Sequence, residues 1–381
     1  MVYITVKQSP MYRQMTLEEL LYGNFKPVMI SNNCSNTRTY ATESVSPKFL
    51  NKFDISSMIL KLVKFNESTE SLRNHTPRSD LYHSFRIPKR SGGLRRIDAP
   101  NDDLMNALRQ LKSILEDDFG ALYHTSAFAY VKKRCTVDAV KKHQANESRW
   151  FGKYDLSNFF GSTTLDFVMK MLSMIFPFSE IMKESLGRSE LEKALSLAFL
   201  NGGLPQGTPL SPTLTNIMMI PIDYKLTNTL RDYNRQSFVY TRYADDFIIS
   251  SRYDFDFKKI EELIVETIKK FDAPFTIKAS KTRYGSSSGA NWNLGVMLNS
   301  KNEITVGHKK KRQFQAMLSS YVMDRKNGIR WDISDIQAME GYRNYYRSVE
   351  KNTIDTMVKH VGEKFGVDIV SMIKKDLNNC I

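Results

Sequence analysis

The chain has 381 residues, of which 41% are apolar and 25% charged, a composition typical of a globular protein with a buried core. This length is expected to hold two or three packed units. Lys and Arg number 55 against 41 Asp and Glu, a net charge of +14. Such an excess favours a polyanionic partner such as nucleic acid over solubility as its only role.

Several classes of protein are excluded. No run approaches the roughly 18 apolar residues that a membrane span needs. The segment Met1–Lys7 is too short for a signal peptide and lacks a small-residue cleavage site. The three cysteines are scattered and the six histidines form no HExxH pair, so neither a disulfide framework nor a zinc site is indicated. We expect a cytosolic protein without membrane contact.

Residues 1–75 form an N-terminal extension of mixed character. Leu17–Phe25 predicts a short helix, Ser31–Ser46 a polar loop, and Ile55–Phe65 a second helix. The role of this extension stays open between binding RNA, binding a partner subunit and packing on the rest of the chain.

Phe85–Pro100 predicts a hairpin of two short strands around Gly92-Gly93. Both arms carry cations, namely Lys89, Arg90, Arg95 and Arg96. Arginine makes bidentate contacts to phosphate, so a triphosphate clamp and an ordinary exposed hairpin are equally compatible with these residues.

Three amphipathic patterns predict helices. The first is capped by Asp102 or Asp103 and ends at Gly120, and the second covers 260–271. The third opens at Lys309–Arg312, a basic run that either faces solvent or follows a duplex backbone, with further helices at about 333–349 and 353–377. Helices that alternate with short hairpins indicate an α+β layer of the split βαβ type.

The tetrapeptide Tyr243-Ala244-Asp245-Asp246 lies between two apolar, β-rich runs. Two adjacent carboxylates at a hairpin tip repel each other, and a cation between them removes that cost. Mg²⁺ prefers one or two carboxylates together with phosphate oxygens and water. The alternative is a solvated Asp-Asp turn, which would be favoured if the tetrapeptide stood alone.

Two further segments point to the same site. Asp155 ends a short apolar run at a strand tip, and Gly202–Pro212 forms a tight loop that carries Gln206. Ser211 as N-cap and Pro212 at the first helical position predict a helix to about Asp232. Nucleotide addition uses two metals about 3.5–4 Å apart, which Asp155 and Asp245 would bridge, with Asp246 nearby.

These segments, in this order, resemble the motifs of bacterial reverse transcriptases: Asp-x-x-x-Phe-Phe, Leu-Pro-Gln-Gly-x-x-x-Ser-Pro and Tyr-Ala-Asp-Asp. Further similar stretches are Arg95–Pro100, Ala127–Tyr130, Lys281-Thr282 and Leu294–Val296. The resemblance covers about residues 80–350 and implies a right-hand polymerase fold of class α+β. Its parts would be fingers at 76–145, a split-βαβ palm with a fingers insertion at 146–305, and a helical thumb at 306–381.

The resemblance also implies roles for individual residues. The metal site would comprise Asp155, Leu156, Asp245 and Asp246 with two Mg²⁺ ions, Mn²⁺ being an alternative. Phe160 would exclude a ribose 2′ hydroxyl and so favour dNTPs, unless it is a core aromatic like Phe159. Lys281 would be the general acid for pyrophosphate departure. The remaining substrate-binding residues would be Lys89 and Arg95 on the triphosphate and Gln206 and Gly207 in the nucleotide pocket. For Lys89 and Lys281 the alternative is an ordinary surface cation.

Within that family the sequence is similar to retron enzymes but departs from them at two places. Asp138–His143 stands where Asn-Ala-x-x-His is expected, and Asn293–Gly295 where Val-Thr-Gly is expected. Because the chain ends soon after the thumb-like helices, we expect no maturase or endonuclease region. These features favour a stand-alone, defence-associated antiphage reverse transcriptase that copies a dedicated noncoding RNA into DNA.

Two alternatives remain open. One is a template-independent or protein-primed DNA polymerase of the abortive-infection type. The other is an RNA-binding scaffold whose polymerase site is vestigial. A homo-oligomer or a partner subunit is compatible with either.

Overall fold

The computed structural model describes residues 5–6, 13–14, 54–74, 77–89, 92–233, 237–288 and 295–378. The predicted helix Leu17–Phe25, the predicted loop Ser31–Ser46 and Leu294 lie outside these residues. The chain divides into two compact units. The first comprises Met1–Lys133, Lys153–Phe247 and Asp256–Arg283, and the second comprises Arg134–Gly152, Ile248–Phe255 and Tyr284–Ile381.

The first described elements are short. Strands β1 (Thr5–Val6) and β2 (Arg13–Gln14) pair antiparallel. Helix α2 (Ile55–Ser68) confirms the helix predicted at Ile55–Phe65, and α3 (Glu70–Asn74) follows it. The Asp54 side chain accepts a hydrogen bond from the Ser57 amide and so caps α2.

The predicted hairpin is confirmed. After a 3₁₀ turn, η2 (Arg78–Leu81), strand β3 (Tyr82–Pro88) pairs antiparallel with β4 (Leu94–Pro100). Gly92 and Gly93 have φ values of 86° and 79°, a left-handed conformation that favours glycine over other residues.

The helix predicted after this hairpin is α4 (Asp102–Ser113), but its cap was predicted wrongly. The side chain of Asn101, not of Asp102 or Asp103, accepts a hydrogen bond from the Leu104 amide. Asp102 and Asp103 occupy the first turn, where a negative charge suits the helix dipole. A π-helical turn, η3 (Ile114–Asp118), extends α4. The apolar face of this helix is buried and comprises Leu104, Leu108, Leu111 and Leu115.

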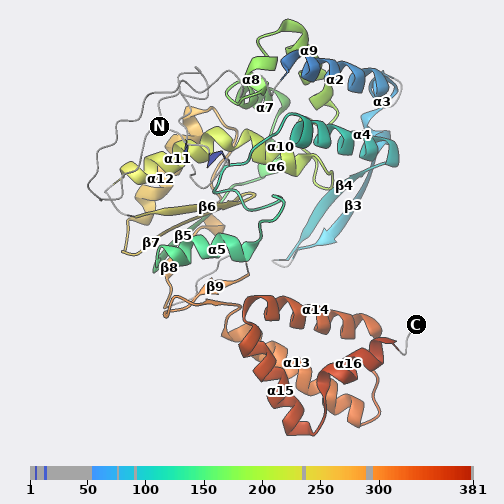
Figure 1. Cartoon of the computed structure of the whole chain (residues 1–381), viewed down its shortest axis with the longest axis vertical. Helices are drawn as coiled ribbons and strands as arrows, with labels where there is room; N and C mark the ends of the chain where they lie inside the picture. Colours follow the sequence, from blue (N-terminus) through green and yellow to red (C-terminus); the bar gives the residue numbers. More distant parts are fainter. Residues whose placement is uncertain are drawn as a thin grey trace, which may run out of the picture. The chain divides into compact units, whose positions relative to one another are not determined.

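A four-stranded sheet has the strand order β6-β7-β5-β8. Figure 1 shows helices above it in that view. The strands are β5 (Trp150–Asp155), β6 (Val239–Tyr243), β7 (Asp246–Ser251) and β8 (Arg283–Ser286). Helices follow β5, a tight turn joins β6 to β7, and α12 (Phe257–Lys270) leads towards β8. This order and connectivity confirm the predicted split βαβ layer.

The segment between β5 and β6 is helical throughout most of its length. It contains α6 (Phe159–Ser162), α7 (Leu165–Leu172), α8 (Phe178–Ile181), α9 (Ser185–Ser196), α10 (Ser211–Met218) and α11 (Ile220–Asp232). The single helix predicted up to Asp232 is therefore wrong, because the helix breaks at Met219. Pro221 has no amide to continue the helical hydrogen bonds and its ring clashes with the preceding turn.

The predicted N-cap of that helix is also wrong. Ser211 is the first residue of α10 and Leu210 precedes it as the cap. The Thr208 hydroxyl accepts a hydrogen bond from the Ser211 amide at 3.2 Å, so a residue one turn earlier satisfies an amide at this buried end of the helix.

The second unit is mainly helical and includes α5 (Thr136–Ala145). Strands β9 (Met297–Leu298) and β10 (Ile304–Thr305) precede α13 (His308–Lys326), α14 (Ile333–Val349), α15 (Lys351–Phe365) and α16 (Ile369–Asn378). The one helix predicted over 353–377 is two helices, because Gly366 adopts φ +66° and ends α15.

These helices share an apolar core. It is built from one buried stripe on each helix, including Phe314, Leu318, Ile336, Met339, Ile354 and Val361. None of the helices in the described ranges is long and apolar enough to cross a membrane.

Candidate active site

Three carboxylates, all of them in the first unit, meet at one end of the four-stranded sheet. Asp155 is the last residue of β5 and Asp246 the first of β7, and these two strands are neighbours. Asp245 lies in the two-residue turn between β6 and β7. The Leu156 amide donates to the Asp245 carbonyl at 3.0 Å, which ties the turn to the end of β5. The structure therefore brings together the three aspartates that the sequence singled out.

Two lysines pair with this carboxylate cluster. Lys281 in the 3₁₀ turn η4 (Ala279–Lys281) places Nζ 2.8 and 3.1 Å from the two Asp155 oxygens. Lys153 places Nζ 2.7 Å from Asp246 Oδ2. Sequence reasoning missed Lys153. Its signal was its spacing, because residues two apart on a strand lie on one face and Lys153 precedes Asp155 by two.

The electrostatics of the cluster reflect crowded negative charge. Burial and the neighbouring carboxylates of Asp246 and Asp155 raise the pKa of Asp245 to about 6. Burial also raises the pKa of Asp246, against the opposing effect of the Lys153 ammonium. The hydrogen bond to Asp155 raises the pKa of Lys281. An added cation would lower the free energy of the ionised carboxylates.

The donor set suits a magnesium ion. Among the described residues, no three His, Cys, Asp or Glu side chains stand in an arrangement that by itself encloses a metal. Mg²⁺ does not need such a cage, because it keeps several waters and takes one or two carboxylates plus substrate phosphates. Asp155, Asp245 and Asp246 offer that kind of incomplete oxygen site.

Phe160 lies five residues after Asp155, in α6, and is half-buried. Its neighbour Phe159 is only 2% exposed, and the Phe159 ring lies 5.0 Å from that of Phe275. The core position of this aromatic pair is therefore filled by Phe159. Phe160 stays partly exposed, unlike Phe159.

The loop that carries Gln206 packs tightly on α6. The Leu204 amide donates to the Phe160 carbonyl at 3.0 Å. A Cβ added to Gly203 would lie 2.2 Å from the Gly161 carbonyl oxygen, so only glycine fits there. These contacts fix the loop on α6 three and two residues before the half-buried Gln206.

The same loop contacts the basic hairpin. The Asp98 amide donates to the Gln206 carbonyl at 2.8 Å. Gly207 has φ +123°, and a Cβ there would lie 2.9 Å from Ile97 Cγ2. Arg95 is on the same face of β4 as Ile97, whereas Lys89 lies at the turn, and both side chains are exposed.

Tyr130 is a further residue near the site. The sequence predicted no role for it. It has φ +60°, is 52% exposed and follows the segment that pairs with Arg242 of β6. Burial of the hydroxyl and the charge of Asp245 raise the pKa of Tyr130, while Arg95 opposes that shift. Tyr130 thus lies within electrostatic reach of both the turn and the hairpin.

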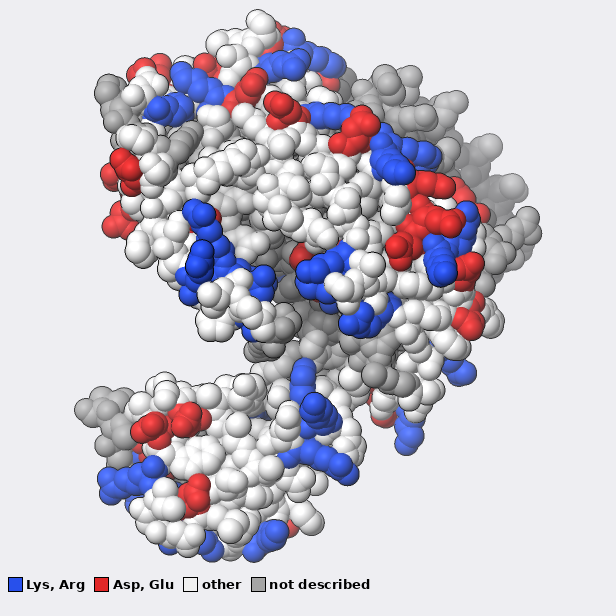
Figure 2. Space-filling model, turned by 180° about the vertical axis from the view of Figure 1, so that it is seen from behind, with Lys and Arg blue, Asp and Glu red and all other residues white. Residues whose placement is uncertain are grey.

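Lys and Arg side chains, blue in Figure 2, gather in clusters on the face drawn there. Such clusters agree with the net charge of +14 and with a phosphate-rich ligand.

Comparison with known families identifies the class of protein. Residues 87–315 match the family model described as reverse transcriptase (RNA-dependent DNA polymerase). The chain belongs to this family, has its right-hand polymerase fold and is an RNA-directed DNA polymerase.

More specifically, it is a retron-like bacterial reverse transcriptase. It is 27% identical to the retron Ec83 reverse transcriptase of Escherichia coli over 77% of this chain and 90% of that protein. It is 29% identical to the retron Ec73 enzyme of Escherichia coli, over 53% of this chain and 64% of that protein. The retron Mx65 enzyme of Myxococcus xanthus is 27% identical over 64% and 57% of the two chains.

Among solved structures, an apo telomerase of Candida tropicalis aligns with a TM-score of 0.42 and 15% identity. That alignment covers 61% of this chain and 56% of the telomerase chain.

Proposed function

We propose that this polymerase adds dNTPs to a 3′ hydroxyl by two-metal phosphoryl transfer at Asp155, Asp245 and Asp246. The observation that supports this most strongly is the convergence of the three carboxylates at adjacent strand ends, tied by the Leu156–Asp245 backbone hydrogen bond. Two Mg²⁺ ions held there, or Mn²⁺ in their place, would stabilise the negative charge on the attacking and leaving oxygens.

The other site residues have separate tasks in this proposal. Lys89 and Arg95 on the exposed hairpin bind the triphosphate of the incoming nucleotide. Gln206 and Gly207 line its pocket, and the Phe160 edge blocks a ribose 2′ hydroxyl. The pocket loop contacts both the hairpin and α6, which supports one arrangement of these groups.

Lys281 is proposed as the general acid that protonates the departing pyrophosphate. Its ammonium is paired with the Asp155 carboxylate. Asp155 would hold a metal ion with the same oxygens, and Lys281 would donate its proton to the departing pyrophosphate. Lys153 stays beside Asp246 and offsets part of its charge.

The proposed organisation is fingers at 76–145, palm at 146–305 and thumb at 306–381. The proposed template is a dedicated noncoding RNA and the proposed setting is antiphage defence. The similarity to retron reverse transcriptases supports a bacterial enzyme with its own RNA.

The template is tested by purifying the protein from cells that carry its native operon and sequencing the co-purified RNA and DNA separately. One abundant structured RNA with DNA complementary to part of it is the expected result. Simple-sequence DNA without a matching RNA would contradict it. DNA that stays attached to the protein after nuclease and denaturant would instead indicate protein priming.

The sugar gate is tested by Phe160→Val with Phe160→Tyr as the matched control. The smaller side chain should raise the incorporation of rNTPs relative to dNTPs by about tenfold or more, since a steric exclusion is lost. Phe160→Tyr keeps the ring and should keep the selectivity. Unchanged selectivity in Phe160→Val would remove Phe160 from this role.

A further inference from the structure

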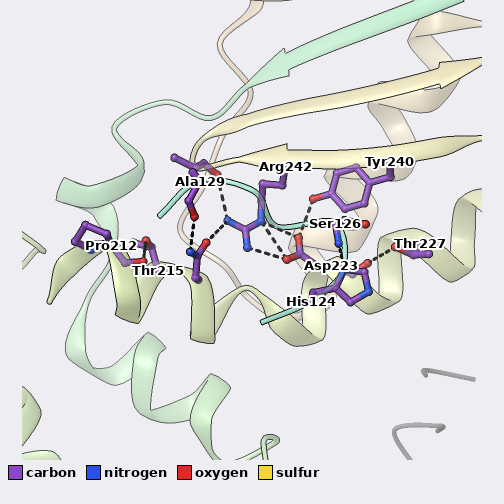
Figure 3. Close-up of polar contacts among 11 residues, drawn as sticks. His124, Ser126, Ala129, Pro212, Thr215, Asp223, Thr227, Tyr240 and Arg242 are labelled. Carbon is purple, nitrogen blue, oxygen red and sulfur yellow. Dashed lines mark hydrogen bonds and ion pairs between the residues drawn. The ribbon is translucent and has the colours of Figure 1, made fainter. Parts of the chain in front are cut away.

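A second charged cluster lies directly behind the catalytic turn and has no solvent contact. Arg242 of β6 and Asp223 of α11 are each 0% exposed. The guanidinium holds the carboxylate with two arms, Nε at 2.9 Å from Oδ1 and Nη2 at 2.8 Å from Oδ2. The Tyr240 hydroxyl donates to the same carboxylate at 2.8 Å, and Figure 3 shows these three side chains converging.

The third arm of the guanidinium points along the strand towards the turn. Arg242 Nη1 lies 3.1 Å from Asn216 Oδ1 and 3.4 Å from the carbonyl oxygen of Ala244. Ala244 is the residue between Tyr243 and Asp245. One side chain therefore contacts helix α10, helix α11 and the turn that carries Asp245 and leads into Asp246.

The cluster also holds the segment that leads to Tyr130. The Arg242 amide donates to the Ser126 carbonyl at 2.6 Å, and the Phe128 amide donates to the Arg242 carbonyl at 2.9 Å. The Asn216 side-chain amide donates to the Ala129 carbonyl at 2.7 Å. The backbone of Arg242 and the side chain of Asn216 thereby both hold the 126–129 segment.

Stability alone is a weak reason for such an arrangement. Replacing a buried ion pair by apolar residues of similar volume is often neutral or stabilising, because desolvating both charges is costly. The turn supplies a more specific reason. Ala244 has φ +56°, which a residue with a Cβ adopts only at a cost in energy. Such a conformation persists where its surroundings enforce it.

We propose that Arg242 is a positioning residue that holds the Ala244–Asp246 turn in its left-handed conformation and so sets the direction of the catalytic carboxylates. It does so from within the core, without touching substrate. Asn216 is its second anchor and Asp223 fixes the guanidinium plane. This inference rests on the proposed catalytic role of Asp245 and Asp246.

Arg242→Lys is the first variant, because lysine keeps the positive charge beside Asp223 but lacks the planar fork that reaches Asn216 and Ala244. DNA synthesis on poly(rA)/oligo(dT) with dTTP and Mg²⁺ should show kcat lowered by about tenfold or more. The KM for dTTP should change by less than about threefold, since no substrate contact is lost. Both are measured well below the melting temperature of the variant.

The second readout needs neither metal nor substrate. Hydrogen–deuterium exchange of the peptide covering 239–250 should be faster in metal-free Arg242→Lys than in the parent protein. Tyr240→Phe is the matched control, since it removes one hydrogen bond to the same Asp223 carboxylate but none to the turn. It should lower the melting temperature while leaving kcat and exchange in 239–250 unchanged.

Asn216→Ala is a milder variant that keeps the ion pair, and it is used if Arg242→Lys does not fold. It should give a smaller change in the same direction in both readouts. Parental kcat and exchange in the folded variant, or an equal loss of kcat in Tyr240→Phe, would overturn the proposal. If instead the assigned carboxylates are wrong, Asp245→Asn would keep activity while Arg242→Lys still loosened the turn.

Discussion

The carboxylate cluster, at the ends of β5 and β7, and the Arg242 cluster, between β6 and α11, use charge in opposite ways. In the carboxylate cluster, the side chain of Lys281 is 49% exposed and that of its partner Asp155 is 5% exposed. The side chain of Lys153 is 21% exposed and that of its partner Asp246 is 20% exposed. In the second, both partners are 0% exposed. A lysine makes a flexible point contact that another cation can replace, whereas a buried arginine fork is fixed in direction. The first cluster is suited to exchange of cations and the second to permanence.

Among variants of the carboxylate cluster, Asp245→Asn should have the largest effect on DNA synthesis. Removing this carboxylate should lower DNA synthesis by at least about 10³-fold, because a ligand for the charge-stabilising cations is lost. The melting temperature without metal should stay equal or rise, since the raised pKa of Asp245 means that its ionised form is disfavoured in the fold. Primer extension and thermal melts in EDTA measure both, and full activity would refute the assigned site.

Among variants of the Arg242 cluster, Asp223→Ala should have the largest effect on the free energy of unfolding. It leaves the Arg242 guanidinium buried without a counter-charge, which costs about 3–5 kcal/mol of the free energy of unfolding. Asp272→Ala is the matched control, because Asp272 pairs with Lys170 at the surface and is 84% exposed. Its cost should stay below about 1 kcal/mol. Equal losses in urea denaturation would erase the distinction between the clusters.

Lys281→Gln and Lys153→Gln should separate the two lysines of the carboxylate cluster. Loss of a general acid should lower kcat by about 10²-fold in Lys281→Gln. Lys153→Gln should change mainly the Mg²⁺ concentration for half-maximal rate, by a few-fold, since Lys153 only offsets the charge of Asp246. Magnesium titrations of the initial rate measure both, and the reverse pattern would exchange the two roles.

The pH dependence of stability should give a smaller effect. The pKa of Asp245 is about 6 in the folded protein, above its ordinary value of 3.8. The folded state therefore holds a proton that the unfolded state has lost, and stability without metal falls as pH rises from about 4 through 6, by roughly 2 kcal/mol. Unfolding in EDTA at pH 4.5 and 7 should show this fall in the parent protein, and Asp245→Asn should lack this part of it.

The sequence located the turn at Tyr243–Asp246 well because its signals are local. Adjacent carboxylates between two β-rich runs, and an aspartate at the end of another strand, predict where the chains turn and what the turns carry. The strand order that brings Asp155 beside Asp246 followed from the alternation of helices and hairpins. Gly92-Gly93 predicted the β3–β4 hairpin for the same reason, because these two residues alone allow the left-handed conformation that the turn needs.

The buried pair escaped sequence reasoning because it depends on the packing of distant elements. Arg242 and Asp223 are 19 residues apart, on a strand and a helix, and either charge alone reads as a surface residue. Two helix breaks were missed for a different reason. Pro221 and Gly366 are both residues that end helices. The apolar periodicity continues on both sides of each, however, and this pattern predicts one unbroken helix.

The contact between Gly161 and Gly203 restricts how this enzyme diversifies. A methyl group at Gly203 would overlap the carbonyl oxygen of Gly161, so α6 and the Gln206 loop have a fixed separation. A mutation that shifts one of them shifts the other. The proposed roles of Phe160 in sugar selection and of Gln206 in the nucleotide pocket are therefore expected to evolve together, and altered nucleotide preference should arise through paired substitutions in both segments.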